Sequence, residues 1–235
     1  MGAADAFLPL PSSLGLQNLE LVGPPGAGKT TICRELIAHH GAAAPKPRLR
    51  RLQHAPRFVV TAVPLLPRIA RRMPWEKAVT VLYLEVLAQV LERPRAVDAE
   101  LCVFDQGPVY HLATIAAPGP MIAVPERLGS WWKDSLDRWA SLLSLIVRLD
   151  ADDAALIERI DARERWHYLK GASEAAVSRE LAGTRALYDR LVTELARRPG
   201  GPDVVRFDTS VEAVDEIVDH LEMLTTRNPA RSRGR

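Results

Sequence analysis

The chain has 235 residues, of which 47% are hydrophobic and 26% are charged, and its formal net charge is +2. This length and apolar content suit one full hydrophobic core, so we expect a single domain over residues 1–235, with a core from about 17 to 224 and fraying termini. The near-neutral charge balance predicts neither a nucleic-acid partner nor a membrane surface. No apolar run reaches about eighteen residues, and the first residues lack the basic start of a signal peptide, so we expect a cytoplasmic protein.

The predicted elements alternate between strands and helices along the chain. In order they are a strand at 19–22, a helix at about 29–40, a loop at 41–57, a strand at 58–63 and a helix at about 75–90. Then come a strand at 101–104, a helix at about 125–144, a strand at 145–149, a helix that continues through 156–160, a helix at 173–198, a strand at 204–207 and a helix at 210–224. Strands that alternate with helices pair in parallel through helical crossovers, so the predicted fold class is α/β.

The two cysteines, Cys33 and Cys102, each lie in an apolar context, one in a predicted helix and one in a predicted strand. Neither belongs to a motif with metal-ligand spacing. We therefore expect two buried thiols, which agree with a reducing compartment.

Residues 23–30 read GPPGAGKT and match the phosphate-binding loop pattern G-x-x-x-x-G-K-[ST] in full, directly after a predicted strand and before a predicted helix. Glycines let the backbone turn so that successive amide N–H groups point at phosphate oxygens, and the start of the helix adds positive potential. We expect Lys29 to bridge the β- and γ-phosphates of ATP and Thr30 to hold Mg²⁺. The loop residues expected to bind the nucleotide are Gly23, Gly26, Ala27, Gly28, Lys29, Thr30 and Thr31.

Asp105 directly follows the apolar run at 101–104. In an open α/β sheet, ligands gather outside the carboxyl ends of the strands, so this aspartate is expected near the phosphates. An aspartate there can order Mg²⁺ or accept a proton from an attacking hydroxyl, and the alternative is a strand-end cap. We expect Asp105 to be both a catalytic and a metal residue.

A basic segment contains Arg159, Arg163, Arg165, His167 and Lys170. In a loose phosphoryl-transfer transition state, negative charge spreads over the equatorial oxygens, and arginines that close over it stabilise it. We expect Arg163 and Arg165 to act in this way. The alternative is a solvated helix face whose arginines pair with neighbouring acidic residues.

A second basic stretch lies between residues 46 and 72 and contains no acidic residue. Such a run is usually a solvated loop or face, and it would also suit an anionic substrate. Both interpretations stay open from the sequence.

The order of the phosphate-binding loop, Asp105, Leu149-Asp150, the 159–165 segment and the run at 207–210 resembles the thymidylate kinase and deoxynucleoside kinase superfamily over about residues 19–224. The resemblance implies a three-layer P-loop fold with five parallel strands in the order 2-3-1-4-5 and helices on both faces. It also implies a lid at about 159–170 and an adenine site near Asp208 and Thr209. Arg159, at the start of that lid, joins the residues expected to bind the nucleotide.

The sequence also departs from the superfamily at the positions that read the acceptor. Thymidylate kinases typically follow the strand-end aspartate with arginine, and this chain has Gln106. Their second strand leads into Arg-Glu-Pro, or Glu-Arg-Ser in deoxynucleoside kinases, and this chain has Ala62-Val63-Pro64. The resemblance therefore extends to the phosphoryl-transfer apparatus and leaves the acceptor open.

The leading hypothesis is a Mg²⁺- and ATP-dependent kinase whose acceptor is a small molecule with a hydroxyl or phosphate group, such as a nucleoside or nucleotide, with a homodimer as a possible assembly. The alternative from another class is an ATP- or GTP-binding regulatory NTPase that acts through a protein partner. A third, a sulfotransferase, is disfavoured because the complete Gly-Lys-Thr ending suits a triphosphate and its metal. Turnover of ATP with and without acceptors discriminates between these hypotheses.

Overall fold

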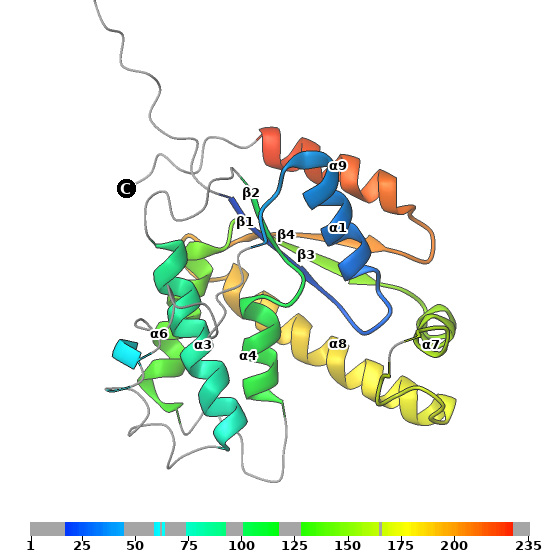
Figure 1. Ribbon diagram of the computed structural model, residues 1–235, viewed down its shortest axis with the longest axis horizontal. Helices are drawn as coiled ribbons and strands as arrows, with labels where there is room; N and C mark the ends of the chain where they lie inside the picture. The colour runs from blue at the N-terminus through cyan, green and yellow to red at the C-terminus, as the bar shows by residue number, and fades with distance from the viewer. Residues whose placement is uncertain are drawn as a thin grey trace, which may run out of the picture.

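The computed structural model describes residues 17–44, 59–61, 63, 74–92, 101–117, 128–164 and 166–227. Its strands are β1 (Gln17–Val22), β2 (Leu101–Phe104), β3 (Leu145–Asp150) and β4 (Asp203–Asp208). They form one parallel sheet in the order β2-β1-β3-β4 (Figure 1). The helices that the structure describes around the sheet are α1 (Lys29–His40), α3 (Trp75–Leu91), α4 (Pro108–Ala116), α6 (Ser130–Leu142), α7 (Asp153–Asp161), α8 (Glu174–Ala196) and α9 (Val214–Arg227).

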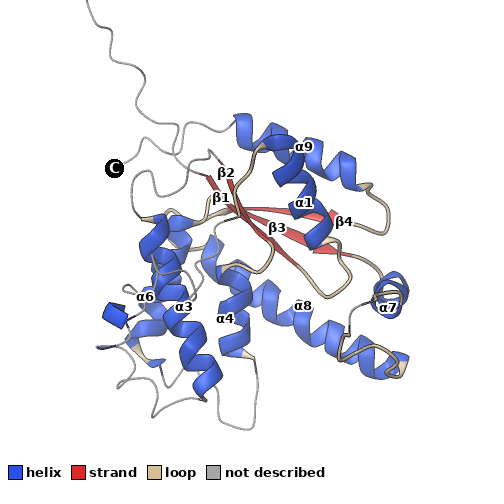
Figure 2. Ribbon diagram, viewed as in Figure 1, coloured by secondary structure: helices blue, strands red, loops and turns tan. Residues whose placement is uncertain are grey.

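Helices cover both faces of the sheet, as the predicted three-layer α/β class requires. Helices α1 and α9 lie on one face, and α3, α4, α6 and α8 lie on the other (Figure 2). Each face has its own cluster of buried apolar side chains. Among the described residues, no helix combines the length and the apolar content needed to cross a bilayer.

The apolar character of β3 follows from its burial on both faces. Leu145, Val147 and Leu149 pack in the cluster with α1 and α9, and Ile146 packs in the cluster with α4 and α6. Successive side chains of a strand point to opposite faces, so a strand covered on both sides is apolar at nearly every position. The strands predicted from such runs at 19–22, 101–104, 145–149 and 204–207 are confirmed.

The predicted strand at 58–63 is wrong. The described residues 59–61 and 63 are helical, and the side chains of Val59, Val60 and Val63 are exposed. Their β-branched side chains favour a strand only where a half-buried pleated surface is available. The outer edge of β2 is met instead by Ala43, whose N–H donates to Leu101 O and whose carbonyl accepts from Val103 N–H, both at 2.8 Å. The described part of the chain therefore has four strands instead of five. The expected order 2-3-1-4-5 is not observed, because the segment expected to form its second strand is helical where it is described.

Helix α4 was not predicted from the sequence. It begins at Pro108, which suits the first helical position because proline lacks an N–H that would have no partner there. Its buried side chains, such as Leu112 and Ile115, face the core. At its other end the Nζ of Lys77 donates to Ile115 O at 2.9 Å and to Ala117 O at 3.0 Å. A cation at this end complements the helix dipole, so α4 is firmly held although it has only nine residues.

Cys33 and Cys102 are both buried, as their apolar context predicts. Burial raises the pKa of the Cys102 thiol to about 12. This thiol therefore stays protonated at neutral pH and is a poor nucleophile.

Gly183 offers a test of helix stability at an exposed position. It lies inside α8, and a Cβ added there would meet no atom within 4 Å. We expect Gly183→Ala to stabilise the protein by about 0.5–1 kcal/mol, because glycine loses more backbone freedom in a helix than alanine does. Urea or thermal unfolding measures the change. An unchanged or lower free energy of unfolding would show that this part of α8 is not an ordinary helix interior.

Candidate functional site

The phosphate-binding loop joins the end of β1 to the start of α1. Gly26 and Gly28 have φ angles of +92° and +79°, which side chains of L-residues rarely adopt. Gly28 is the N-cap of α1, and no side chain caps the helix there. The first amides of α1 therefore face the loop, and a helix start of this kind attracts an anion.

The loop also packs closely against the neighbouring strand and helix. A Cβ on Gly23 would lie 2.1 Å from the carbonyl oxygen of Leu149, at the end of β3. A Cβ on Gly26 would lie 3.2 Å from both the Cδ2 and the carbonyl oxygen of Leu156 in α7. Close approach therefore requires glycine at position 23, backbone conformation favours it at position 28, and both apply at Gly26.

The half-buried side chain of Lys29 lies across the loop. Its Nζ donates to the carbonyl oxygens of Gly23 and Pro24, each at 2.7 Å. The pKa of Lys29 is lowered to about 8, mainly by burial; the charge of Asp105 opposes this shift, and the charge of Arg163 contributes to it. A phosphate group placed beside this ammonium would favour its charged form.

Thr30 and Asp105 are brought together from positions 75 residues apart. The hydroxyl of Thr30 donates to Oδ2 of Asp105 at 2.8 Å. They meet because β1 and β2 are parallel neighbours, so their carboxyl ends lie at the same edge of the sheet. A hydroxyl and a carboxylate are oxygen ligands of the kind that Mg²⁺ prefers, with phosphate oxygens and waters supplying the rest. The described residues contain no group of three or more His, Cys, Asp or Glu that could hold a metal by themselves.

Arg159 lies in the last turn of α7 and links the loop to the turn after β4. Its Nη1 donates to Gly26 O at 3.3 Å and to the Thr209 hydroxyl at 3.0 Å, and its Nη2 donates to Thr209 O at 2.8 Å. Thr209 is tied in turn to β3, since its N–H donates to Asp150 O at 2.8 Å. Asp208 is exposed beside it, and its Oδ1 accepts from Ser210 N–H at 2.8 Å. These predicted residues therefore lie next to the loop.

The segment after α7 carries Arg163, whose side chain is exposed. The segment folds back on itself, because Lys170 Nζ donates to Arg163 O and Gly171 N–H donates to Asp161 Oδ1. The positive charge of Arg163 contributes to lowering the pKa of His167 as well as that of Lys29. Arg163 is thus close to the loop lysine. Arg165 and the basic residues of the 46–72 stretch lie outside the described residues.

Arg185, on α8, was missed by the sequence analysis. Its Nε donates to Asp150 Oδ2 at 2.9 Å, its Nη1 donates to Asp153 Oδ1 at 2.6 Å, and its Nη2 donates to Ala151 O at 2.9 Å. These contacts hold the turn between β3 and α7 that borders the loop. No local pattern could have revealed them, because the partners are more than 30 residues apart in the sequence.

Glu20 was also missed. It is a lone acidic residue inside the apolar strand β1, and its side chain is fully buried. Burial raises its pKa to about 8, although N–H groups at the start of α4 oppose the shift. The sequence did contain a signal, which is an acidic residue within a predicted buried strand. Burying a carboxyl is costly unless hydrogen bonds satisfy it, so such a residue points to specific partners.

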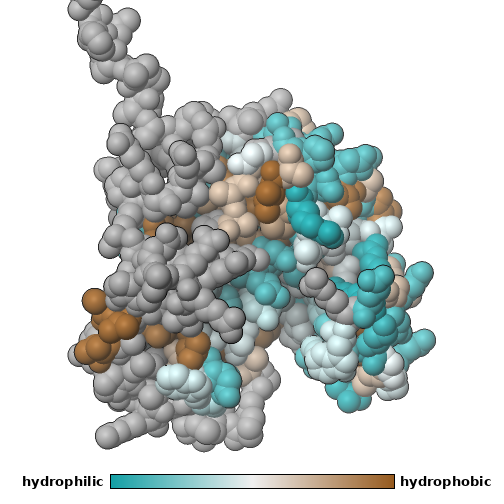
Figure 3. All heavy atoms as spheres, in the orientation of Figure 1, coloured by the Kyte–Doolittle hydropathy of each residue, from teal (hydrophilic) through white to brown (hydrophobic). Residues whose placement is uncertain are grey.

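Three half-buried rings lie on α3 and α4 near this glutamate. The His111 ring centroid is 4.7 Å from that of Tyr83 and 5.2 Å from that of Tyr110. Burial lowers the pKa of His111 to about 4, so the ring is neutral at pH 7. Figure 3 shows the molecule hollowed between α4 and the end formed by α7 and α8. Of the tryptophans, Trp139 is buried in the core and Trp131 Nε1 donates to Glu85 Oε1 at 2.8 Å, whereas Trp75 and Trp166 are exposed.

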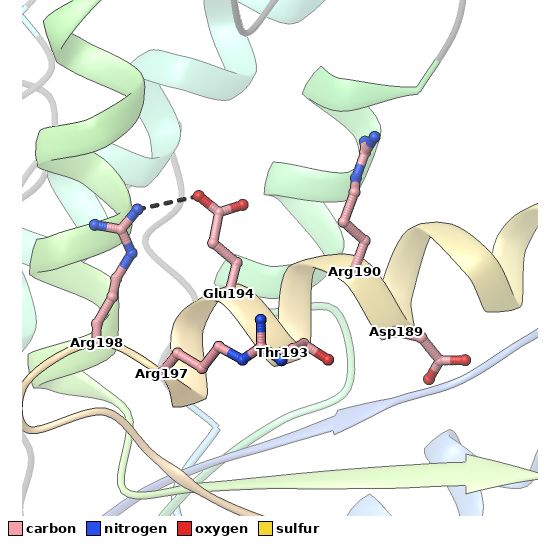
Figure 4. A pocket seen from close by; sticks show the side chains of 6 residues that line it. All are labelled: Asp189, Arg190, Thr193, Glu194, Arg197 and Arg198. Carbon is pink, nitrogen blue, oxygen red and sulfur yellow. Dashed lines mark hydrogen bonds and ion pairs between the residues drawn. The ribbon is translucent and has the colours of Figure 1, made fainter.

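A pocket of about 520 Å³ lies away from this site, on the last turns of α8 (Figure 4). Its lining residues are Asp189, Arg190, Thr193, Glu194, Arg197 and Arg198. Arg198 is already paired with Glu194 at 3.1 Å and with Asp137. None of the predicted site residues lines this pocket, so the chemistry is to be sought at the phosphate-binding loop.

Comparison with known proteins supports the fold. No protein-family model matches the sequence, and no curated protein matches it significantly. The structure resembles that of the YorR protein from Bacillus subtilis, solved in complex with phosphorylated GDP, with 15% identity, a TM-score of 0.53 and coverage of 89% of this chain and 96% of that one. It also resembles thymidylate kinase from Candida albicans, with 14% identity, a TM-score of 0.53 and coverage of 92% and 93%. The expected resemblance to thymidylate kinase-like P-loop kinases is confirmed at the level of the fold.

Proposed function

We propose that this protein is a phosphotransferase that moves the γ-phosphoryl group of ATP, with Mg²⁺, to a small acceptor that bears a hydroxyl or a phosphate group. The observation that carries the proposal is the Thr30–Asp105 hydrogen bond beside a complete phosphate-binding loop. It joins the two oxygen ligands that a phosphoryl-transfer site needs at the edge of the sheet where ligands gather. We propose one kinase domain for the whole chain.

In this proposal the phosphates lie against the amides of the loop and the start of α1. The residues that bind them are Gly23, Gly26, Ala27, Gly28, Lys29, Thr30 and Thr31. Lys29 exchanges its two carbonyl acceptors for phosphate oxygens, and its charge acts on the β- and γ-phosphates. Arg159, Asp208 and Thr209 border the side on which the rest of the nucleotide lies.

Thr30 and Asp105 hold Mg²⁺ in this proposal. When bound, Mg²⁺ neutralises charge on the phosphate oxygens. Asp105 also lies where it can accept the proton of the attacking hydroxyl, since its second oxygen is not needed for the bond to Thr30. Arg163 supplies positive charge from the segment after α7, and Arg165 belongs to the same segment.

The acceptor is proposed to lie beside the rings of Tyr83, Tyr110 and His111. These rings are half-buried, and Tyr110 and His111 lie in the first turns of α4, the helix that begins three residues after Asp105. The Tyr83 and Tyr110 rings are inclined to the His111 ring by 56° and 77°, so the three rings share no plane and a nucleobase would stack on one of them. A nucleoside or nucleotide is therefore the first acceptor class to test.

The test is ATP turnover with Mg²⁺ in the presence and absence of nucleosides, nucleoside monophosphates and hydroxyl-bearing metabolites. A kinase gives a phosphorylated acceptor and faster ADP release with one class. Hydrolysis that no acceptor accelerates, together with stimulation by a protein partner, would favour the regulatory NTPase. Absence of both nucleotide binding and turnover would exclude the two functions together.

Arg163→Ala tests the role of the segment after α7. We expect it to lower turnover by roughly tenfold to a hundredfold and to change ATP affinity by less than about threefold, because the arginine acts mainly on charge that develops in the transition state. Steady-state kinetics and nucleotide titration measure the two effects. Arg206→Ala is the matched control, since this arginine is exposed on β4 and pairs with Asp189. Equal losses in both variants would show that removing an exposed arginine lowers turnover without regard to its position, and would contradict a specific role for Arg163.

A further inference from the structure

We infer that Glu20 is a positioning residue, which fixes the turn that carries Asp105 and thereby sets Asp105 against Thr30. The inference rests on the proposed function of that pair. Glu20 does not touch the phosphate-binding loop through any contact described above, so it would act through the turn.

The carboxyl of Glu20 caps helix α4 from a distant strand. Its Oε2 accepts from Val109 N–H at 2.8 Å, and its Oε1 accepts from Tyr110 N–H at 3.0 Å. The first amides of a helix have no partner within the helix, and the N-cap Gly107 has no side chain to supply one. Glu20, which lies 89 positions before Val109, therefore supplies the acceptors that an N-cap side chain would otherwise provide.

Both ends of the turn are attached to this one residue. The turn runs from Phe104, the last residue of β2, to Pro108, the first residue of α4. On one side, Glu20 is the register partner of Phe104 in the parallel pair β1–β2. On the other side, its carboxyl holds the first turn of α4. Asp105 lies between these two anchors, so its freedom to move is limited by Glu20.

The turn also passes directly over the Glu20 side chain. A Cβ on Gly107 would lie 2.8 Å from Glu20 Cδ and 2.6 Å from Phe104 Cβ. The φ of Gly107 is −97°, outside the left-handed region, so the backbone conformation alone does not require glycine here. The close approach of these two side chains does. The carboxyl thus fills the space beneath the turn and bonds to the helix that follows it.

Filling this space with a fully buried acid costs free energy. Removing a carboxyl from water disfavours its charged form, and an apolar side chain would avoid that cost. An apolar side chain would leave the amides of Val109 and Tyr110 without acceptors. The benefit of an acid at this position is therefore a defined start for α4, and Asp105 is the proposed site residue that this start controls.

The test compares wild type with Glu20→Gln by titrating ADP with and without Mg²⁺. A glutamine oxygen can accept from one amide, but its NH₂ group faces the other amide N–H, so the turn loosens. We expect ADP affinity without Mg²⁺ to stay within about threefold of wild type. We expect the gain in affinity that Mg²⁺ gives to fall at least about tenfold, and turnover with Mg²⁺ and ATP to fall by a similar factor.

Asn18→Ala is the matched control. Asn18 is buried on the same strand and face, two residues before Glu20, and its side-chain amide donates to Leu142 O at 2.7 Å. Its loss should lower the free energy of unfolding without changing the response to Mg²⁺. If the glutamine variant does not fold, Glu20→Asp keeps a carboxyl group on a shorter side chain, and the same titrations apply to it.

The inference is overturned if the variant at Glu20 keeps the wild-type response to Mg²⁺, if Asn18→Ala loses that response equally, or if Mg²⁺ does not tighten ADP binding in wild type. A wild-type protein that binds ADP more tightly with Mg²⁺ but phosphorylates no acceptor would contradict the proposed kinase activity instead. In that case the titrations still decide the role of Glu20.

Discussion

Replacing Lys29 with alanine is expected to lower ATP turnover by at least about a thousandfold and to leave the fold intact. The lysine side chain lies across the phosphate-binding loop, and its Nζ contacts only two loop carbonyls in the hydrogen bonds described. Its positive charge would stabilise the β- and γ-phosphates most strongly in the transition state. Steady-state kinetics measures the loss, and circular dichroism with thermal unfolding checks the fold.

The stability of this variant is a separate part of the prediction. Burial lowers the pKa of Lys29 to about 8, which means that the folded protein disfavours the charged ammonium. Removing the side chain should therefore leave the melting temperature unchanged or slightly higher. Lys133→Ala is the matched control, because Lys133 is an exposed lysine on α6 that pairs with Asp137. Wild-type turnover in Lys29→Ala, or unfolding of that variant, would contradict the role proposed for Lys29.

Replacing Asp105 with asparagine is expected to lower turnover by about a hundredfold or more. The amide oxygen of asparagine can still accept the hydrogen bond from Thr30, so the turn after β2 should keep its position. The amide cannot accept a proton from the acceptor, and it is a weaker ligand for hydrated Mg²⁺ than a carboxylate. Nucleotide affinity without Mg²⁺ should stay within roughly tenfold of wild type, because the phosphates contact the loop.

Single-turnover kinetics and nucleotide titration separate the two effects of Asp105→Asn. Asp134→Asn is the control, since Asp134 is an exposed aspartate on α6. The opposite pattern, with nucleotide affinity lost and the single-turnover rate preserved, would assign Asp105 to a structural role at the end of β2.

Some of the site could be predicted because its residues are neighbours in the sequence. The phosphate-binding loop is a continuous run of eight residues whose glycines, lysine and threonine have fixed positions in the pattern. As the pattern predicts, it joins a strand to the start of a helix. Asp105 could be placed near Thr30 because parallel strands end at the same edge of a sheet. The 2.8 Å between their side-chain oxygens agrees with that geometry.

The sequence by itself determined the α/β class, the phosphate-binding loop and the four strands, because these depend on local periodicity and backbone geometry. The tertiary structure decided which segment meets the edge of β2, since Ala43 and not the valines at 59–63 bonds to that strand. It also decided the roles of Glu20 and Arg185, whose partners lie 89 and more than 30 residues away. Hydrogen bonds between distant segments depend on how the chain packs, so local periodicity does not predict them.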